Sequence, residues 1–333
     1  MNKKSDLLVV GAGPVGLFTA FYAGMRNLSV TLIDSLPEIG GQPKALYPQK
    51  NIFDIPVHPR ISGEELTNQL FDQVRRFADT TDIRLEEEVQ AVEKQADGSF
   101  IVHSSQSSYH VRAVIIAAGN GSFKARKVKL AGADQYEGLG LDYFISDYQQ
   151  FIGKTVAVCG GGDSALDTAL GLRDIADQVY LIHRRDGFRA HEHSVSIAKK
   201  ANNISFLTPY VPIEIVGNGQ HVTGIQLQKG RSDDQVNLEV DQVIMAYGFT
   251  SSIGPIKDWG LDLQQNNILV NENMQTSIPG IFAVGDIVSY PGKTKLIVSG
   301  FGEAPTAINA AFSYIHPDQL ISPVHSSTLF EGE

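Results

Sequence analysis

The sequence predicts an α/β protein made of two three-layer domains of the same kind, the second inserted into the first. A unit of strand, glycine-rich turn, helix and strand occurs twice with equal spacing, because Gly11 to Asp34 and Gly160 to His183 each span 23 positions. An apolar strand that fits the first unit, residues 281–284, comes only after the second unit is complete. The length of 333 residues also suits two domains. Units of this pattern are typical of Rossmann-like dinucleotide-binding domains.

The first unit opens with an apolar strand, residues 7–10, and a turn that contains Gly11, Gly13 and Gly16. Gly11 permits the tight turn, Gly13 lets the backbone approach a pyrophosphate, and Gly16 lets the helix pack on the strand. Asp34 ends the second strand, where a carboxylate accepts hydrogen bonds from ribose hydroxyls and repels a 2′-phosphate. The first unit is therefore predicted to bind FAD or NAD rather than NADP.

The second unit differs at the end of its second strand. Its turn supplies the candidate phosphate-binding residues Gly160, Gly162, Asp163 and Ser164. In place of an acid, the strand ends at a basic cluster, consisting of Arg184, Arg185 and, a little further on, Arg189. Guanidinium groups match phosphate geometrically, and this cluster comes where the 2′-oxygen of an adenosine ribose is expected. The second unit is therefore predicted to bind NADP(H), which leaves FAD for the first.

The remaining strands set the expected domain boundaries. Residues 114–118 and 281–284 are apolar runs that close the first unit, and residues 242–246 close the second. We therefore expect an FAD-binding domain of residues 1–117 and 281–333, and an NADPH-binding domain of residues 118–280. Residues 86–111 alternate apolar and polar side chains around Asp97-Gly98, which predicts an antiparallel hairpin.

Composition excludes several classes of function. The net charge of -10, from 27 basic and 37 acidic residues, argues against nucleic acid as a partner. The single cysteine, Cys159, excludes an intramolecular disulfide or a redox dithiol and suits a reducing cytoplasm, so a cytoplasmic protein is expected. Glycines interrupt the apolar residues 7–23, and no other stretch approaches the roughly 20 apolar residues of a membrane span, so no membrane partner is expected.

These motifs, together with Gly41-Gln42 and residues 282–286, resemble the thioredoxin-reductase-like flavoproteins over essentially the whole chain. Thioredoxin reductases of that family carry a Cys-x-x-Cys pair just before the NADPH turn, whereas residues 141–150 here contain no cysteine. Without a dithiol, the flavin cannot reduce thioredoxin by disulfide exchange. Residues 41–48, 300–307 and 325–327 are more similar to the ferredoxin–NADP reductases of the thioredoxin-reductase type.

The resemblance implies a homodimer with one FAD per subunit and further contacts to that cofactor. Tyr47 would stack on the isoalloxazine, and Gln42 and Asp286 would hold the ribityl and pyrophosphate side. The backbone of Val89 would meet the adenine edge, while Phe123 would line the FAD pocket or be an ordinary core aromatic.

Two expectations concern the C-terminal segment. Ser327 would reach the cofactor from the tail, beside His325, which either covers the flavin or is a surface histidine. A helix that starts near Pro305 or Thr306 would point its positive end at the flavin.

The implied acceptor is ferredoxin or flavodoxin. Because such carriers are acidic, a positive rim near the flavin is expected. Its candidate residues are Lys44, Lys124, Arg126, Lys127, Lys129, Lys293 and Lys295.

The expected chemistry belongs to the two cofactors. NADPH delivers a hydride to the flavin, which then passes single electrons to the acceptor. Because that hydride step needs no protein acid or base, we name no catalytic side chain. The alternatives are a reductase of a disulfide or peroxide pathway whose thiols lie on another chain, an NADPH-dependent quinone or small-molecule reductase, and an NADPH-bound sensor or scaffold.

Overall fold

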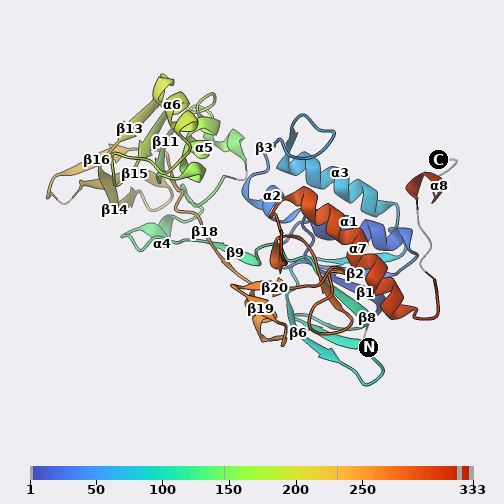
Figure 1. Cartoon of the computed structure of the whole chain (residues 1–333). Coiled ribbons are helices and arrows are strands. Elements are labelled where there is room, and N and C mark those ends of the chain that lie inside the picture. Colours follow the sequence, from blue (N-terminus) through green and yellow to red (C-terminus); the bar gives the residue numbers. More distant parts are fainter. Residues whose placement is uncertain (1–2, 146, 231, 321–324, 330–333) are drawn as a thin grey trace. The chain divides into compact units, whose positions relative to one another are not determined.

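The computed structural model describes residues 3–145, 147–230, 232–320 and 325–329, and the chain divides into two compact units (Figure 1). Unit 1 comprises Met1–Ser122 and Ser251–Glu333, and unit 2 comprises Phe123–Thr250. The chain passes from one unit to the other within β9 (Ser122–Ala125) and β18 (Phe249–Ser252), which pair in a two-stranded sheet.

Unit 1 is built on a mostly parallel sheet. Its strands are β1 (Lys3–Val10), β2 (Val30–Ile33), β3 (Asn51–Ile52), β4 (Ile61–Ser62), β5 (Thr81–Arg84), β6 (Val89–Lys94), β7 (Phe100–Ser104), β8 (Ser108–Ile116), β19 (Leu263–Gln264), β20 (Asn267–Leu269), β21 (Ile281–Ala283) and β22 (Val288–Ser289). Its helices are α1 (Pro14–Met25), α2 (Gly41–Leu46), α3 (Gly63–Arg75), η2 (Gly254–Asp258), η3 (Gly285–Ile287), α7 (Ile297–Ile315) and α8 (Ser326–Leu329).

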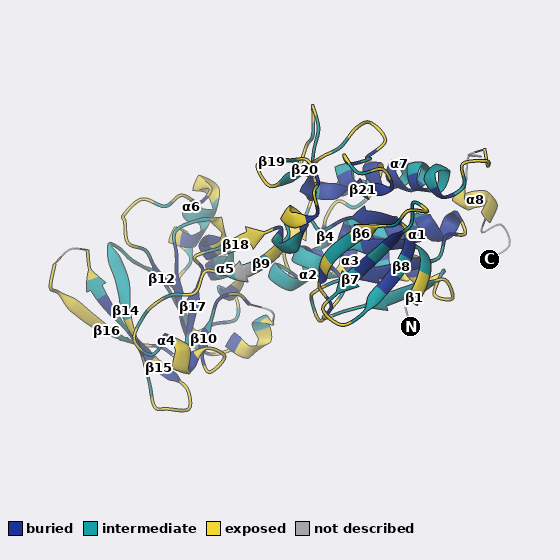
Figure 2. Cartoon of the chain, turned by 90° about the horizontal axis from the view of Figure 1, so that it is seen from below, coloured by how far each residue is buried: buried dark blue, intermediate teal, exposed yellow. Residues whose placement is uncertain are grey.

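The main sheet of unit 1 has the order β5-β2-β1-β8-β7-β6, with β21 also paired to β8. β5, β2, β1, β8 and β21 are parallel, while β6 and β7 continue as the expected antiparallel hairpin. Successive side chains of a strand point to opposite faces. Leu7 and Val9 therefore join the core beneath α1, α3 and α7, and Leu8 joins the core on the other face. Figure 2 shows these central strands as buried.

Unit 2 repeats the three layers. Its elements are α4 (Ala133–Tyr136), β10 (Leu141–Asp142), η1 (Tyr148–Phe151), β11 (Thr155–Cys159), α5 (Asp163–Leu172), β12 (Gln178–Ile182), α6 (Glu192–Lys200), β13 (Ile204–Leu207), β14 (Tyr210–Gly217), β15 (Val222–Lys229), β16 (Gln235–Glu239) and β17 (Gln242–Met245). A parallel sheet of order β10-β17-β11-β12-β13 lies between helices α5 and α6 on one face and the antiparallel sheet β14-β15-β16 on the other. The predicted fold class is confirmed.

The second of the two boundaries between the units differs from the expected domain boundary. The first crossing, between residues 122 and 123, lies close to the expected 118, whereas the second lies between 250 and 251 rather than at 280. Residues 251–280 belong to unit 1 because Trp259, Leu261 and Ile268 are buried with Val114 and Ile116 of β8. Their short elements carry no nucleotide motif, so this packing could not be predicted from the sequence.

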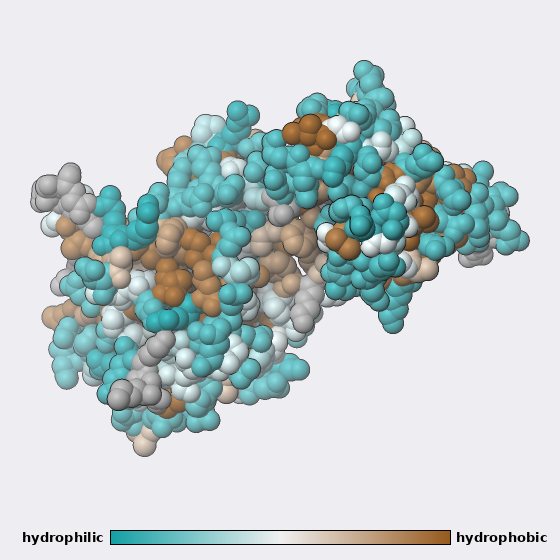
Figure 3. Space-filling model, turned by 180° about the vertical axis from the view of Figure 1, so that it is seen from behind, coloured by the Kyte–Doolittle hydropathy of each residue, from teal (hydrophilic) through white to brown (hydrophobic). Residues whose placement is uncertain are grey.

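No helix in the described part of the chain is long and apolar enough to span a membrane. Hydrophilic side chains cover most of the face shown in Figure 3.

Candidate functional site

In the first glycine turn, neighbouring backbone atoms exclude a side chain at Gly11 and Gly16, whereas the backbone at Gly13 is open. A Cβ on Gly11, whose φ is +104°, would lie 2.5 Å from the carbonyl oxygen of Ala117. A Cβ on Gly16 would lie 1.8 Å from the carbonyl oxygen of Gly11. At Gly13, by contrast, the nearest atom to such a Cβ is the Cα of Gly41, at 3.8 Å. The open backbone at Gly13 is what a pyrophosphate needs in order to approach the start of α1.

Asp34, directly after β2, is tied to this turn. Its Oδ2 accepts the N–H of Ala12 at 2.6 Å, and its Oδ1 accepts the N–H of Leu36 at 2.9 Å. Burial raises the pKa of Asp34, and the backbone hydrogen bonds partly oppose that rise. A carboxylate offers about four acceptor positions, and the backbone N–H groups of Ala12, Ser35 and Leu36 do not use all of them, so an acceptor position remains for a ribose hydroxyl.

Helix α2 begins against the same turn. Gly40 donates its N–H to the carbonyl of Ala12 at 2.8 Å, and Gly40 and Gly41 both have positive φ. A Cβ on Gly41 would lie 2.8 Å from the Cα of Gly13, so only glycine permits this approach. Gln42 therefore follows a residue in close contact with the phosphate turn.

The structure places Tyr47 within electrostatic range of Asp286, although the two residues are far apart in sequence. Tyr47 follows α2, and Asp286 lies in η3, after β21. Burial raises the pKa of Tyr47, and the nearby charges of Asp286 and Asp54 raise it further. The two candidate flavin contacts thus occupy one region of unit 1.

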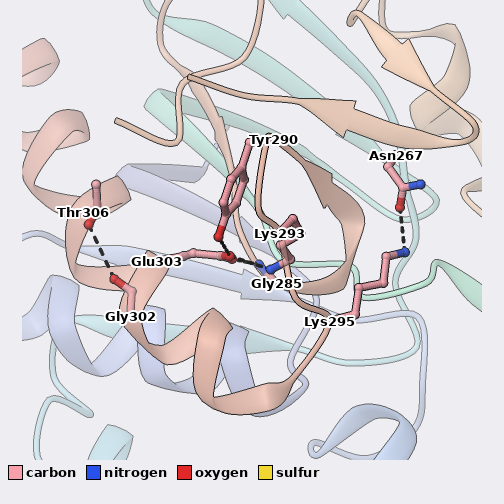
Figure 4. A network of polar contacts seen from close by, with 8 residues as sticks. All are labelled: Asn267, Gly285, Tyr290, Lys293, Lys295, Gly302, Glu303 and Thr306. Carbon is pink, nitrogen blue, oxygen red and sulfur yellow. Dashed lines mark hydrogen bonds and ion pairs between the residues drawn. The ribbon is translucent and has the colours of Figure 1, made fainter. Parts of the chain in front are cut away.

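A buried ion pair between Glu303 and Lys293, which could not be foreseen from the sequence motifs, lies beside Gly285, the residue before Asp286 (Figure 4). Glu303 accepts the N–H of Gly285 at 2.7 Å through Oε2, and the hydroxyl of Tyr290 at 2.8 Å through Oε1. The same Oε1 forms an ion pair with Lys293, and the side chains of Lys293 and Glu303 are only 6% and 5% exposed. One feature of the sequence could have indicated a buried charge, because Glu303 is the only charged residue in the otherwise apolar or neutral sequence of α7.

This pair corrects the expected positive rim. Lys293 lies buried against Glu303 and therefore cannot belong to a surface rim. Two of the other expected members are paired at the surface, Lys127 with Glu137 at 2.7 Å and Lys44 with Glu38 at 3.2 Å. The side chain of Lys124 lies outside the described residues.

The expected helix start was also wrong. Helix α7 begins at Ile297, so Pro305 lies in its interior. Proline has no N–H to donate to the carbonyl of Phe301, which costs a helix about 3 kcal/mol. Burial of the apolar face, including Ala304 and Ile308, offsets this cost and keeps the helix continuous.

No contact places the three remaining candidate FAD-binding residues, Val89, Phe123 and Ser327, at the first glycine turn in the part of the chain that the structure describes. Val89 is buried in the core with its backbone paired to Ser104, and Phe123 packs edge-to-face on Phe249 with 6.0 Å between ring centroids. Ser327 is exposed on α8, and Figures 1 and 2 show α8 and α2 at opposite ends of unit 1. The cofactor contacts of all three stay predictions.

The second glycine turn follows the same design. A Cβ on Gly160 would lie 2.6 Å from the carbonyl oxygen of Ala246, whereas a Cβ on Gly162 would meet no atom within 4 Å. Asp163 and Ser164, in the first turn of α5, are exposed. Oδ1 of Asp163 accepts the N–H of His191 at 2.8 Å, which holds the basic segment after β12 against the start of α5.

The basic cluster of unit 2 is open to a ligand. Arg184, Arg185 and Arg189 are exposed, and none forms an ion pair with another residue that the structure describes. The N–H of Arg189 donates to the carbonyl of Gly161 at 2.8 Å, so the cluster is anchored to the glycine turn. Burial and the charges of Arg184 and Arg185 lower the pKa of His183, whose ring lies against Gly161. Exposed guanidiniums beside a phosphate turn suit a 2′-phosphate.

Cys159 ends β11 and is fully buried. Burial raises the pKa of its thiol, which makes it an inert structural cysteine. No group of three or more His, Cys, Asp or Glu side chains among the described residues could hold a metal ion.

The chain resembles known proteins over its full length. The family described as pyridine nucleotide-disulphide oxidoreductase matches residues 5–311. The chain belongs to this family. Two bacterial proteins named ferredoxin–NADP reductase 2 are similar to the chain over essentially its whole length. That of Listeria monocytogenes is 53% identical over 330 residues, and that of Bacillus subtilis is 51% identical over 332 residues. The alignments cover 99% and 100% of this chain and 99% of each relative.

Solved structures also resemble the chain over most of its length. The thioredoxin reductases of Lactococcus lactis and T. acidophilum each superimpose with a TM-score of 0.74, at 25% and 28% identity. The alignments cover 93% and 94% of this chain and 99% of each of those proteins. The resemblance to the ferredoxin–NADP reductases of the thioredoxin-reductase type is thereby confirmed.

Proposed function

We propose that this chain is a ferredoxin–NADP reductase that binds FAD in unit 1 and NADPH in unit 2. The observation that carries the proposal is the opposite charge at the ends of two equivalent strands. Asp34 after β2 excludes a 2′-phosphate, whereas the free guanidiniums after β12 attract one. Each turn also has one glycine, Gly13 or Gly162, where the backbone is open to a phosphate.

The residues present fit both cofactors. Gly13 and the start of α1 would bind the FAD pyrophosphate, Asp34 the adenosine ribose, and Asp286 the ribityl side, with Tyr47 against the flavin ring. Gly162 and the start of α5 would bind the pyrophosphate of NADPH, with the 2′-phosphate held by the basic cluster. When bound, the flavin accepts a hydride from NADPH and releases electrons singly. The protein binds and orients the reactants, and no side chain of this chain has to move a proton in that step.

The acceptor is proposed from the relatives, which are named ferredoxin–NADP reductases. A reductase that itself exchanges disulfides is disfavoured, because the only cysteine of the chain is buried. From the resemblance we also propose a homodimer located in the cytoplasm, and a contact of Ser327 in the C-terminal tail with the cofactor.

The test is acceptor-dependent kinetics. The purified protein should be yellow, and NADPH should bleach the bound flavin under anaerobic conditions. Cytochrome c reduction by NADPH should be slow alone and should accelerate when ferredoxin or flavodoxin is added. Equal rates with and without the carrier, together with fast reduction of quinones, would favour a small-molecule reductase instead.

Replacing Cys159 with Ser should leave NADPH oxidation nearly intact. Because the thiol is buried and keeps its proton, it takes no part in electron transfer. The variant should lose at most a few kcal/mol of stability, about 1–3, from burying a hydroxyl. Turnover with ferredoxin and thermal unfolding measure the two effects. A large loss of turnover in a folded, FAD-loaded variant would show that the thiol takes part in the reaction.

A further inference from the structure

The buried ion pair in unit 1 is assembled by a tight turn. Residues 290–293 read Tyr-Pro-Gly-Lys, Gly292 has a φ of +84°, and the N–H of Lys293 donates to the carbonyl of Tyr290 at 3.1 Å. Proline followed by glycine at positive φ is the signature of a type II turn. The turn directs the Tyr290 hydroxyl and the Lys293 ammonium to the same carboxylate oxygen of Glu303 (Figure 4).

The other oxygen of Glu303 reaches the turn that bears Asp286. It accepts the N–H of Gly285, which is buried and has a φ of +81°. One helical turn before Glu303, a Cβ on Gly300 would lie 3.3 Å from the Cα of Gly285 and 2.4 Å from Cγ2 of Val15 in α1. The ion pair therefore lies next to the point where α7, the turn after β21 and the phosphate-binding helix α1 meet.

A buried ion pair at this place is not explained by stability. Two charges lose their hydration on burial, and well-packed apolar residues of the same volume are often equally stable or more stable. What an apolar pair cannot supply is an acceptor for the buried N–H of Gly285. The carboxylate supplies one, and Lys293 and Tyr290 supply the donors that hold the carboxylate in place.

We propose that Glu303, whose carboxylate is held by Lys293, is a positioning residue that acts through the N–H of Gly285 to set the Asp286 carboxylate toward FAD. This inference rests on the proposed function, because it takes FAD to lie in unit 1. Lys293 holds Glu303, Glu303 holds the backbone of Gly285, and Asp286 is the next residue of that backbone. Neither Glu303 nor Lys293 has to touch the cofactor.

The experiment compares two doubly substituted proteins that both lack the buried charges. Lys293→Met/Glu303→Gln keeps a side-chain oxygen that can accept the N–H of Gly285. Lys293→Met/Glu303→Met has a similar volume and no such oxygen. The measurements are the FAD dissociation constant, from flavin fluorescence on dilution of the holoprotein, and the visible absorption and circular dichroism of the bound flavin.

The Gln variant should bind FAD within about threefold of the parent, while the Met variant should bind it about tenfold or more weakly. The flavin spectrum should change only in the Met variant. Tyr290→Phe removes one of the two donors to Glu303 but keeps the ion pair and the Gly285 hydrogen bond, so it should bind FAD more tightly than the Met variant. Should the Met variant be recovered unfolded, Lys293→Met/Glu303→Asn replaces it, because the shorter amide cannot reach Gly285.

Equal FAD affinity and equal spectra in the Gln and Met variants would overturn the inference, whatever their thermal stability. A parent protein that binds no FAD would instead overturn the proposed function, and the inference with it. The parent measurement alone separates these two results.

Discussion

Replacing Arg184 and Arg185 together with alanine should abolish the preference for NADPH over NADH. Both guanidiniums are exposed, and neither pairs with another described residue, so each is available to a 2′-phosphate. Loss of one charge-assisted contact costs about 1.5–3 kcal/mol. The double variant should therefore lose roughly a hundredfold to ten-thousandfold in kcat/KM with NADPH. The effect should appear mainly in KM, because the contact is remote from the hydride that is transferred.

The kinetics with NADH provide the internal control, since that cofactor has no 2′-phosphate and its KM should barely change. Arg173→Ala is a matched variant, because Arg173 lies at the other end of α5 and pairs with Asp174 through two hydrogen bonds. It should keep the preference for NADPH. Equal use of NADPH and NADH by the unmodified protein would refute the assignment of the basic cluster.

Two separate variants, Gly13→Ala and Gly16→Ala, should both lose FAD, but only Gly16→Ala should also lose thermal stability. At Gly16 the new methyl group would lie 1.8 Å from the carbonyl oxygen of Gly11, so the start of α1 must move. Overpacking of this kind costs about 1–3 kcal/mol or more, and the variant should lose both thermal stability and FAD. At Gly13 the methyl group finds space and a φ of -72°, which alanine adopts without strain. That variant should be folded, with the apoprotein as stable as the parent, and should purify without FAD because the methyl group fills the phosphate approach.

Thermal unfolding of the apoproteins and the flavin content after purification measure these effects. Gly162→Ala is the counterpart in unit 2, where the methyl group also meets no atom within 4 Å. It should retain FAD and raise the KM for NADPH. A Gly13→Ala protein that keeps full flavin content would show that the pyrophosphate does not approach this turn.

The sequence predicted those features that local chemistry determines. Gly11 and Gly16 are dictated by backbone atoms less than 3 Å from where a side chain would begin, so their spacing identifies the turn without a structure. The contrast between Asp34 and Arg184 likewise depends only on the residues that directly follow the second strand of each unit. For this reason both predicted turns, and the three layers around them, agree with the structure.

Features set by distant parts of the chain could not be predicted in the same way. Glu303 and Lys293 are each unremarkable in sequence and become a buried pair only when α7 packs over η3. The same holds for Trp259, whose ring nitrogen donates to the carbonyl of Gln90 at 3.0 Å and thereby fixes residues 251–280 to unit 1. The prediction that a helix starts near Pro305 was wrong, because burial of the apolar face of α7 outweighs the local preference of proline for the first turn of a helix.

The interruption of unit 1 has a consequence for how the chain is made. Strand β21 pairs with β8 across the whole inserted unit, from Ala283 back to Ile116. During synthesis, which proceeds from the N-terminus at about 5–20 residues per second, unit 2 is complete while unit 1 still lacks β21 and α7. Nascent chains should therefore acquire protease resistance in unit 2 first, and the edge of β8 stays open until residues near 283 emerge. If Asp286 contacts FAD as proposed, FAD binding should be among the last steps in the biogenesis of the protein, because the turn that carries Asp286 comes only with that final segment.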